Sequence, residues 1–169
     1  MTSAATGTPL DGRLLTVGWR EWLAFPDLGI AQIKAKVDTG ARTSALHAFF
    51  VEPYEQHGSP MVHFGVHPLQ RRDDVVRECH AAVVDHRWVS DSGGHRERRY
   101  VILTTLVLGP HSWSVELTLT NRDDMRFRVL LGRTAMRGRL LINPASSYLV
   151  GRRSPRKGGR RRSAEGSPT

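Results

Sequence analysis

The sequence contains a single cysteine, Cys79, among its 169 residues. One thiol cannot form a disulfide within the chain, which fits a reducing cytoplasm and excludes the disulfide-stabilised scaffolds of small secreted domains. No apolar run approaches the roughly 18–20 residues of a membrane-spanning helix. Residues 1–9 lack the charged start and apolar centre of a secretory signal. We therefore expect a cytoplasmic protein that does not bind membranes, with Cys79 as a small buried side chain.

Acidic residues are also scarce, because 16 Asp and Glu stand against 25 Lys and Arg, for a formal net charge of +9. Residues 152–169 contain seven basic residues and one acid, so this segment carries +6 and the remainder +3. Its Arg, Gly, Ser and Pro content offers little to bury, and we expect a disordered basic tail. The tail is either a solvated extension or a weak contact for an anionic partner, such as ribosomal RNA or an acidic protein tail.

Metal and nucleotide signatures are missing as well. Eight histidines are present, but none forms His-Glu-x-x-His, and there is no Cys-x-x-Cys pair. His63 and His67 are four residues apart on an expected strand and share a face, although zinc would need a third ligand from elsewhere. No Gly-x-x-x-x-Gly-Lys loop exists to hold a nucleotide phosphate. We expect no metal and no other cofactor, and a zinc peptidase is the least favoured interpretation.

What the sequence does contain is a series of short, alternating or β-branched segments. They predict strands at 14–19, 30–37, 48–54, 60–66, 75–88, 99–108, 112–120, 127–131 and 146–150. The one expected helix covers about Arg133–Arg137 and ends at Gly138, and residues 43–48 are a candidate for a further helical turn. This pattern predicts one all-β domain over residues 14–151, folded as a closed or nearly closed barrel. A flexible leader (1–13) precedes it and the basic tail (152–169) follows it.

One of these strands ends in an Asp-Thr-Gly-Ala turn. Residues 30–37 deliver the carboxylate of Asp38 to the strand end, where Gly40 lets the backbone turn sharply. About 90 residues later, residues 129–133 combine an apolar strand with Gly-Arg and the expected helix. Asp-Thr-Gly alone is common in ordinary turns, so Asp38 by itself could be a turn-capping aspartate. The two segments together resemble the core signature of retropepsins, which makes Asp38, Thr39 and Gly40 the catalytic candidates.

The resemblance extends to further segments. Residues 17–22, 34–48, 118–123 and 130–133 are similar to one bacterial family, long described as ATP-dependent zinc proteases and also as retropepsin-like aspartic endopeptidases. Some relatives accompany ATP-grasp ligases that add glutamates to a ribosomal protein, and the resemblance implies that those relatives trim such tails. For this chain it implies a retropepsin-like barrel, peptidase activity and a possible ATP-grasp ligase partner, to which any ATP dependence would belong.

Amide hydrolysis by carboxylates requires two of them close together and sharing one proton. The sequence has one Asp-Thr-Gly, so we expect a homodimer in which Asp38 of each chain meets its twin at a two-fold axis. In this dimer, Thr39 would brace the turn through its hydroxyl group and Gly40 would admit the substrate backbone. Ser147–Val150 would add strand pairing at the interface.

The residue that follows Asp-Thr-Gly-Ala departs from the retropepsin pattern. In retropepsins it is usually acidic and pairs with the Gly-Arg arginine, whereas here it is Arg42. Arg42 and Arg133 would therefore lie near the cleft without that partner, and arginine binds carboxylates through a planar fork of two hydrogen bonds. This arrangement predicts an acidic or glutamate-rich peptide, or a glutamate-tailed protein, as substrate. The alternative is that another acid, such as Glu116 or Asp123, neutralises Arg42.

Four further residues complete the candidate substrate site. Ala41 and His47 follow the catalytic turn closely, although His47 could equally be structural. Gly93 and Gly94 form the tip of a hairpin that has the place of the retropepsin flap in the chain order, and a Gly-Gly tip should be mobile. The alternative for this segment is an ordinary surface hairpin. If Asp38 is not catalytic, the chain is a β-barrel module that binds acidic tails or a ribosomal surface.

Overall fold

The computed structural model describes residues 13–91, 93–122 and 124–150. The expected leader up to residue 12, the basic tail and Asp123 lie outside these residues. Eleven strands, one short α-helix and one 3-10 turn make up the described part. The strands are β1 (Leu15–Gly18), β2 (Arg20–Phe25), β3 (Ile30–Val37), β4 (Ser44–His47), β5 (Phe50–Gln56), β6 (Ser59–Val66), β7 (Arg77–Ser90), β8 (Arg96–Leu108), β9 (His111–Thr120), β10 (Val129–Leu131) and β11 (Leu140–Asn143). The 3-10 turn η1 covers Pro26–Leu28, and the helix α1 covers Arg133–Met136.

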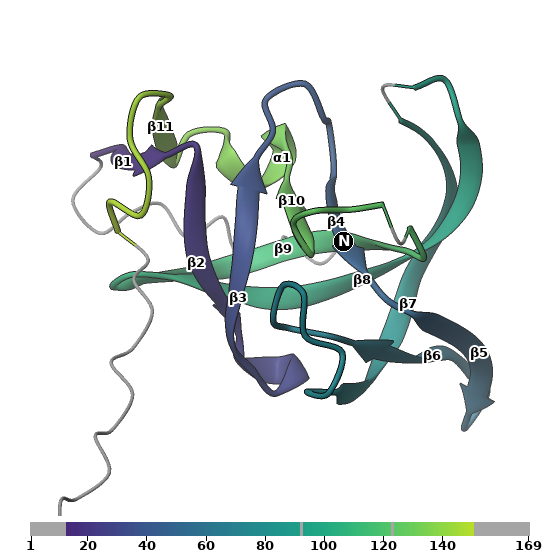
Figure 1. The fold of residues 1–169 in the computed structure, drawn as a ribbon. Coiled ribbons are helices and arrows are strands. Elements are labelled where there is room, and N and C mark those ends of the chain that lie inside the picture. The colour runs from purple at the N-terminus through teal and green to yellow at the C-terminus, as the bar shows by residue number, and fades with distance from the viewer. Residues whose placement is uncertain (1–12, 92, 123, 151–169) are drawn as a thin grey trace, which may run out of the picture.

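Six of the strands close into a barrel (Figure 1). Their order is β2-β3-β10-β4-β9-β8, and β8 returns to β2 through the pair Ala24 and Val107. Strands β7, β6 and β5 continue the sheet beyond β8. Strands β1 and β11 form a separate parallel pair. The expected all-β barrel is therefore confirmed, as is the short helix after Gly132.

The barrel interior is filled by the inward-facing residues of each strand. On β3, Ile33, Ala35 and Val37 are buried, while Lys34 and Lys36 face outward. This alternation follows from the two-residue period of a strand. Burying each large aliphatic or aromatic side chain contributes about 1.5–3 kcal/mol. The largest fully buried apolar side chains are Phe25, Phe64, Ile30, Ile33, Leu46, Ile102, Leu106, Leu108, Leu117 and Leu131.

Strand β10 determines the geometry of the candidate site. Strands β3 and β4 are consecutive in the chain but not adjacent, because β10 lies between them. It runs parallel to β3, with Val129 opposite Ala35, and antiparallel to β4, with Val129 opposite Leu46. This insertion brings the loop between β3 and β4 beside the start of α1. No helix within the described ranges is long and apolar enough to cross a membrane.

The structure departs from the expected secondary structure in three places. The expected strand 14–19 is present as β1, but strand β2, which follows a bend at Trp19, was not expected. Residues 44–47 form strand β4 and not a helical turn, since all four are buried between β10 and β9.

The third departure concerns residues 146–150, which form no strand in the described structure. Their backbone is held by β2 instead: Tyr148 N–H donates to the Arg20 carbonyl at 3.0 Å, and Leu149 N–H donates to Glu21 Oε1 at 2.8 Å. The segment is thus bound to its own barrel, and the strand pairing that we expected from Ser147–Val150 at a dimer interface has no strand to supply it.

Candidate active site

The Asp38 turn begins directly at the end of β3. Asp38 N–H donates to the Leu131 carbonyl of β10 at 2.9 Å, which fixes the start of the turn in the sheet. Its side chain then organises the turn, because Asp38 Oδ1 accepts the Gly40 N–H at 3.0 Å. The carboxylate is half-buried, while Thr39 and Gly40 are exposed. One carboxylate oxygen is thus held by the backbone at a surface that a substrate or a second protein copy can reach.

The helix α1 interlocks with this turn. Arg133 N–H donates to the Ala41 carbonyl at 2.9 Å, and Thr134 N–H donates to the Arg42 carbonyl at 3.0 Å. Gly132 N–H donates to Ser44 Oγ at 3.0 Å. The first N–H groups of a helix lack partners within the helix, and here the turn after Asp38 supplies them. The two sequence segments of the retropepsin-like signature are therefore in direct contact.

The two arginines have different surroundings. The Arg133 guanidinium donates to the Thr39 carbonyl at 3.0 Å, so it braces the Asp38 turn from outside. Arg42 is exposed, and no carboxylate of the described residues forms an ion pair with it. Glu116, one of the two acids considered as its partner, pairs with Arg87 at 2.9 Å instead. The other, Asp123, lies outside the described residues.

The tip of the β7–β8 hairpin is organised by a second aspartate. Asp91 Oδ1 accepts the N–H groups of Gly93 and His95, both at 2.9 Å. Burial opposes ionisation of this carboxyl, but the hydrogen bonds from His95 and Gly93 and the nearby positive charges lower its pKa overall. Gly93 and Gly94 themselves are exposed. In Figure 1 this tip and the β3–β4 loop rise at the same edge of the barrel, and no hydrogen bond joins them among the described residues.

Arg122 is a residue that the sequence analysis did not single out. Its guanidinium pairs with Asp91 at 3.0 Å, which ties the hairpin tip to the segment after β9. Its backbone N–H donates to His47 Nδ1 at 3.1 Å. His47 is only 1% exposed, so it supports this segment from inside the barrel and does not present its ring to solvent. The signal was available, since Arg122 stands in one of the segments that carry the family resemblance.

A polar network, partly exposed at Glu97 and buried from Arg99 and Thr118 inward, continues from the hairpin stem to the Asp38 turn. Glu97 Oε1 accepts from Arg99 Nε and from Thr120 Oγ1, both at 2.6 Å. Thr118 Oγ1 donates to the Ser44 carbonyl at 3.1 Å. The hydroxyl oxygen of the same serine, Ser44 Oγ, accepts the Gly132 N–H. Because buried polar groups are costly when unpaired, this network fixes the relative positions of the hairpin stem, β4 and α1.

The histidines do not gather into a metal site. His63 lies between Glu52 and Glu78, at 3.4 and 3.8 Å, and stacks on His80. His67 instead stacks on the ring of Phe49. No group of three His, Cys, Asp or Glu side chains within the described ranges is arranged to hold a metal ion. The pair His63 and His67 that we considered as zinc ligands is thus separated into two different environments.

Comparisons with known proteins agree with this geometry. A family model described as "Retropepsin-like aspartic endopeptidase RimB" matches residues 16–153. A "Probable alpha-L-glutamate ligase" of Shewanella halifaxensis is 46% identical over 138 residues, covering 82% of this chain and 30% of that protein. One with the same name from Parasynechococcus marenigrum is 48% identical over 139 residues, with the same coverage. The chain therefore spans about 30% of the length of the curated relatives that it matches.

A solved structure shares the fold. It is the crystal structure of Lpg0085, a Legionella pneumophila protein whose function is stated as unknown, with a TM-score of 0.65 and 25% identity. The match covers 79% of this chain and 96% of that one. The zinc-protease description has no support in these comparisons or in the described side chains. With four-fifths of its length matched by the family model and the Asp38 turn interlocked with the Gly-Arg helix, the chain belongs to the RimB-like family of retropepsin-like aspartic endopeptidases.

Proposed function

We propose that this protein is an aspartic-type endopeptidase that acts as a homodimer on acidic or glutamate-rich peptides or tails. The observation that carries the proposal is the Asp38 carboxylate, which the β3–β10–α1 interlock holds in a defined position at an accessible surface. Thr39 and Gly40 form the exposed edge of the same turn, where a substrate backbone would pass.

The chemistry requires the second Asp38. Among the described residues of one chain, no other carboxylate is hydrogen-bonded to Asp38, and two carboxylates about 3 Å apart share one proton because both cannot ionise. In the dimer, the ionised carboxylate removes a proton from water while the water oxygen bonds to the scissile carbonyl carbon, and the protonated partner donates its proton to the carbonyl oxygen. The carboxyl that took the water proton then gives it to the amide nitrogen as the C–N bond breaks, and the other carboxylate takes back a hydroxyl proton from the intermediate. The Thr39 hydroxyl would position the Asp38 turn of the partner copy. The Gly93–Gly94 tip would position the substrate.

Two observations support an acidic substrate. Arg42 lies next to the catalytic turn without a carboxylate partner in the described structure, so its guanidinium can bind substrate carboxylates. The relatives named as probable alpha-L-glutamate ligases contain a region like this chain within a longer protein. A peptidase that shares a polypeptide with a glutamate ligase would meet the product of that ligase. A ligase of the ATP-grasp type is accordingly the partner that we propose for this chain.

Cleavage of an oligoglutamate-bearing peptide, followed by mass spectrometry, tests the proposal. We expect the wild type to shorten the peptide and Asp38→Asn to leave it intact, because the amide cannot replace the ionised base. An asparagine Oδ1 can still accept the Gly40 N–H, so the turn should survive. Asp74→Asn is the matched control, since Asp74 is exposed and pairs with Arg72 at the surface. Equal cleavage by wild type and Asp38→Asn would refute the assignment.

The same exposed Arg42 would also suit a non-catalytic module that binds acidic tails. The two functions differ in one result: Asp38→Asn should bind an oligoglutamate peptide in both cases, but only a peptidase loses an activity. A wild type that binds this peptide and never cleaves it would favour the binding module.

A further inference from the structure

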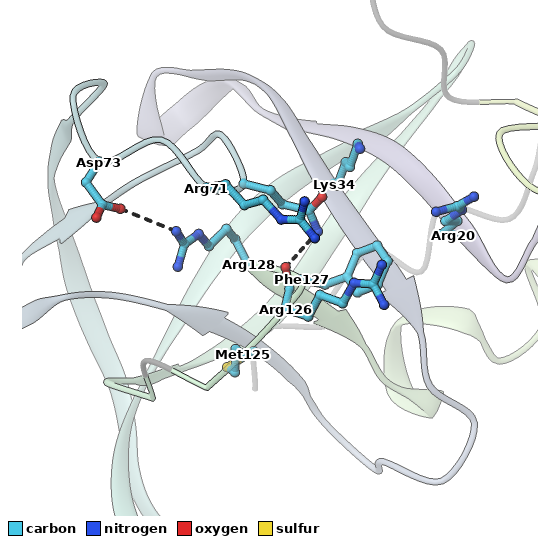
Figure 2. Close-up of a pocket in the computed structure, with 9 residues that line it drawn as sticks. Arg20, Lys34, Arg71, Asp73, Met125, Arg126, Phe127 and Arg128 are labelled. Carbon is cyan, nitrogen blue, oxygen red and sulfur yellow. Dashed lines mark hydrogen bonds and ion pairs between the residues drawn. The ribbon is translucent and has the colours of Figure 1, made fainter.

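A strongly cationic pocket lies on the outer side of the barrel, away from the residues that sequence analysis assigned to the site (Figure 2). Its volume is about 560 Å³. Five cationic side chains and one carboxylate line it, a formal charge of +4. They come from β2, β3 and the two loops at 67–76 and 121–128. The lining residues are Arg20, Lys34, Gln70, Arg71, Asp73, Met125, Arg126, Phe127 and Arg128.

Two of the cations are held by aromatic rings. The Arg20 guanidinium lies 4.6 Å from the ring centroid of Trp19 and 5.0 Å from that of Tyr148. The Lys34 ammonium lies 5.2 Å from the centroid of Trp22. A cation–π contact fixes the position of a cation without cancelling its charge. Both groups are therefore positioned and still able to donate hydrogen bonds to an anion.

The remaining cations have almost no counter-charge in the described structure. Arg71 and Arg126 are exposed, and neither forms an ion pair with a described carboxylate. Arg128 is 12% exposed and reaches Asp73 only at 3.5 Å. Its Nε has no hydrogen-bond partner within the described residues. Grouping like charges in one pocket is unfavourable unless a ligand neutralises them.

One residue that lines the pocket, Arg71, has a strained backbone conformation. Arg71 has a φ of +58°, in the left-handed region that side chains other than glycine rarely adopt. This conformation costs about 1 kcal/mol or more. The loop is nonetheless held in place, because Gln70 Nε2 donates to the Arg126 carbonyl at 2.7 Å and so joins the two loops. Figure 2 shows Lys34, Arg71 and Arg126 around the centre of the pocket, with Arg20 set apart from them at the right of the view.

The pocket and the catalytic turn share strand β3. Lys34 and Lys36 are two residues apart on the outward side of β3, and Asp38 directly follows the end of this strand. At about 3.3 Å per residue, Lys34 and Asp38 are separated by about 13 Å along the strand. An extended peptide of about four residues spans this distance, with exposed Lys36 between the two positions.

We propose that this pocket is an exosite that binds a run of carboxylates in an acidic peptide, some four residues from the bond that is cut. The proposal rests on the proposed function for the identity of the substrate, but it predicts a binding site that does not depend on catalysis. Arginine clusters bind carboxylates through charge-assisted hydrogen bonds. We favour a peptide over nucleic acid because the matched relatives are named as glutamate ligases.

The test measures binding of a fluorescein-labelled decaglutamate peptide by fluorescence anisotropy, with the full chain carrying Asp38→Asn so that no cleavage interferes. We compare Arg71→Gln/Arg126→Gln with the control Arg72→Gln/Arg98→Gln. Both double variants remove two positive charges from exposed side chains, but Arg72 and Arg98 do not line the pocket. We expect the pocket variant to raise Kd at least about tenfold, since each lost charge-assisted contact is worth about that much. The control should stay within about twofold of the parent.

Equal weakening by the two variants would overturn the exosite and leave only a general charge effect. No weakening by either variant would also overturn it, because the pocket would then not bind the peptide. A labelled decauridylate that binds more tightly than the peptide, and loses this binding in the pocket variant, would also overturn it and assign the pocket to nucleic acid. Failure of the proposed function is distinguishable from these results. If the peptide binds through the pocket but wild type never cleaves it, the peptidase assignment fails and the pocket stands as a carboxylate-binding site.

Discussion

A single methyl group added at Gly132 should disturb the Asp38 turn more than it disturbs the fold. The backbone of Gly132 has φ −91° and ψ 173°, which any residue adopts, so only contacts decide the effect. An alanine Cβ there would lie 2.5 Å from the carbonyl carbon of Thr43, 2.7 Å from its oxygen and 3.0 Å from the Arg42 oxygen. Ordinary contact begins at 3.4 Å, and the atoms in the way are backbone atoms of the turn. The turn and α1 must therefore separate by about 0.9 Å.

The magnitude follows from that displacement. Overpacking against fixed structure costs about 1–3 kcal/mol, which for a domain of this size lowers Tm by about 2–12 °C. Catalysis is more sensitive, because a misplacement of about 1 Å lowers a rate by on the order of 100-fold. We therefore expect Gly132→Ala to remain folded at 25 °C while it loses most of its activity on an oligoglutamate peptide.

The assay combines urea denaturation with measurement of kcat. Gly58→Ala is the matched control: Gly58 lies in the β5–β6 turn at φ +76°, and a Cβ there meets nothing within 4 Å. The backbone strain of alanine at this position costs about 1 kcal/mol, with no effect on the Asp38 turn. If Gly132→Ala were within about 0.5 kcal/mol of wild type in stability and kept its full kcat, the interlock would not determine the position of Asp38.

Three other predictions follow from buried or ionised groups. Glu21→Ala should lower the free energy of unfolding by about 3 kcal/mol, because Glu21 Oε1 accepts N–H groups from Gly18 and Leu149. Urea denaturation measures this, with Glu55→Ala, at an exposed glutamate, as the control. An equal loss of stability in the two variants would contradict the prediction. Burial raises the pKa of the Cys79 thiol to about 11, so Ellman's reagent at about pH 8 should react only after unfolding; rapid labelling of the native protein would refute this. The pKa of Asp91 is lowered from its ordinary value of 3.8, so its stabilising contribution is present above that pH and lost as the pH falls through the lowered pKa. Asp91→Asn should therefore lower the free energy of unfolding at neutral pH and make it depend less on pH in the acid range. Parallel curves of unfolding free energy against pH for wild type and Asp91→Asn would contradict this.

The parts of the fold that could be predicted are those with a local signal. Strand β3 alternates buried and exposed residues, and the Asp38 turn at its end is encoded within a few residues. Strand β4 was missed because all of its residues are buried, so Ser44–His47 has no alternation to detect. The parallel pairing of β1 with β11 joins segments that are more than 120 residues apart in the chain, and no local pattern reports such a contact.

The candidate site also has parts that a local sequence signal predicts and parts that depend on long-range contacts. Asp38 and the Gly-Arg segment were predictable because each is a short motif, and the family resemblance gave their order. The brace from Arg133 to the Thr39 carbonyl and the ion pair between Arg122 and Asp91 depend on long-range geometry. The cationic pocket draws its side chains from four separate segments. In the sequence, the only local sign of the pocket is the close spacing of Arg126 and Arg128, which both line it.

The most direct test of a shared catalytic pair is a mixing experiment. Wild type and Asp38→Asn are combined in varying ratios, allowed to exchange subunits fully, and assayed on the oligoglutamate peptide at constant total protein. If each active site needs Asp38 from both copies, only pure wild-type dimers cleave, and activity falls as the square of the wild-type fraction, to about one quarter in an equal mixture. A linear fall, to about one half, would mean that each chain works alone and would contradict the account.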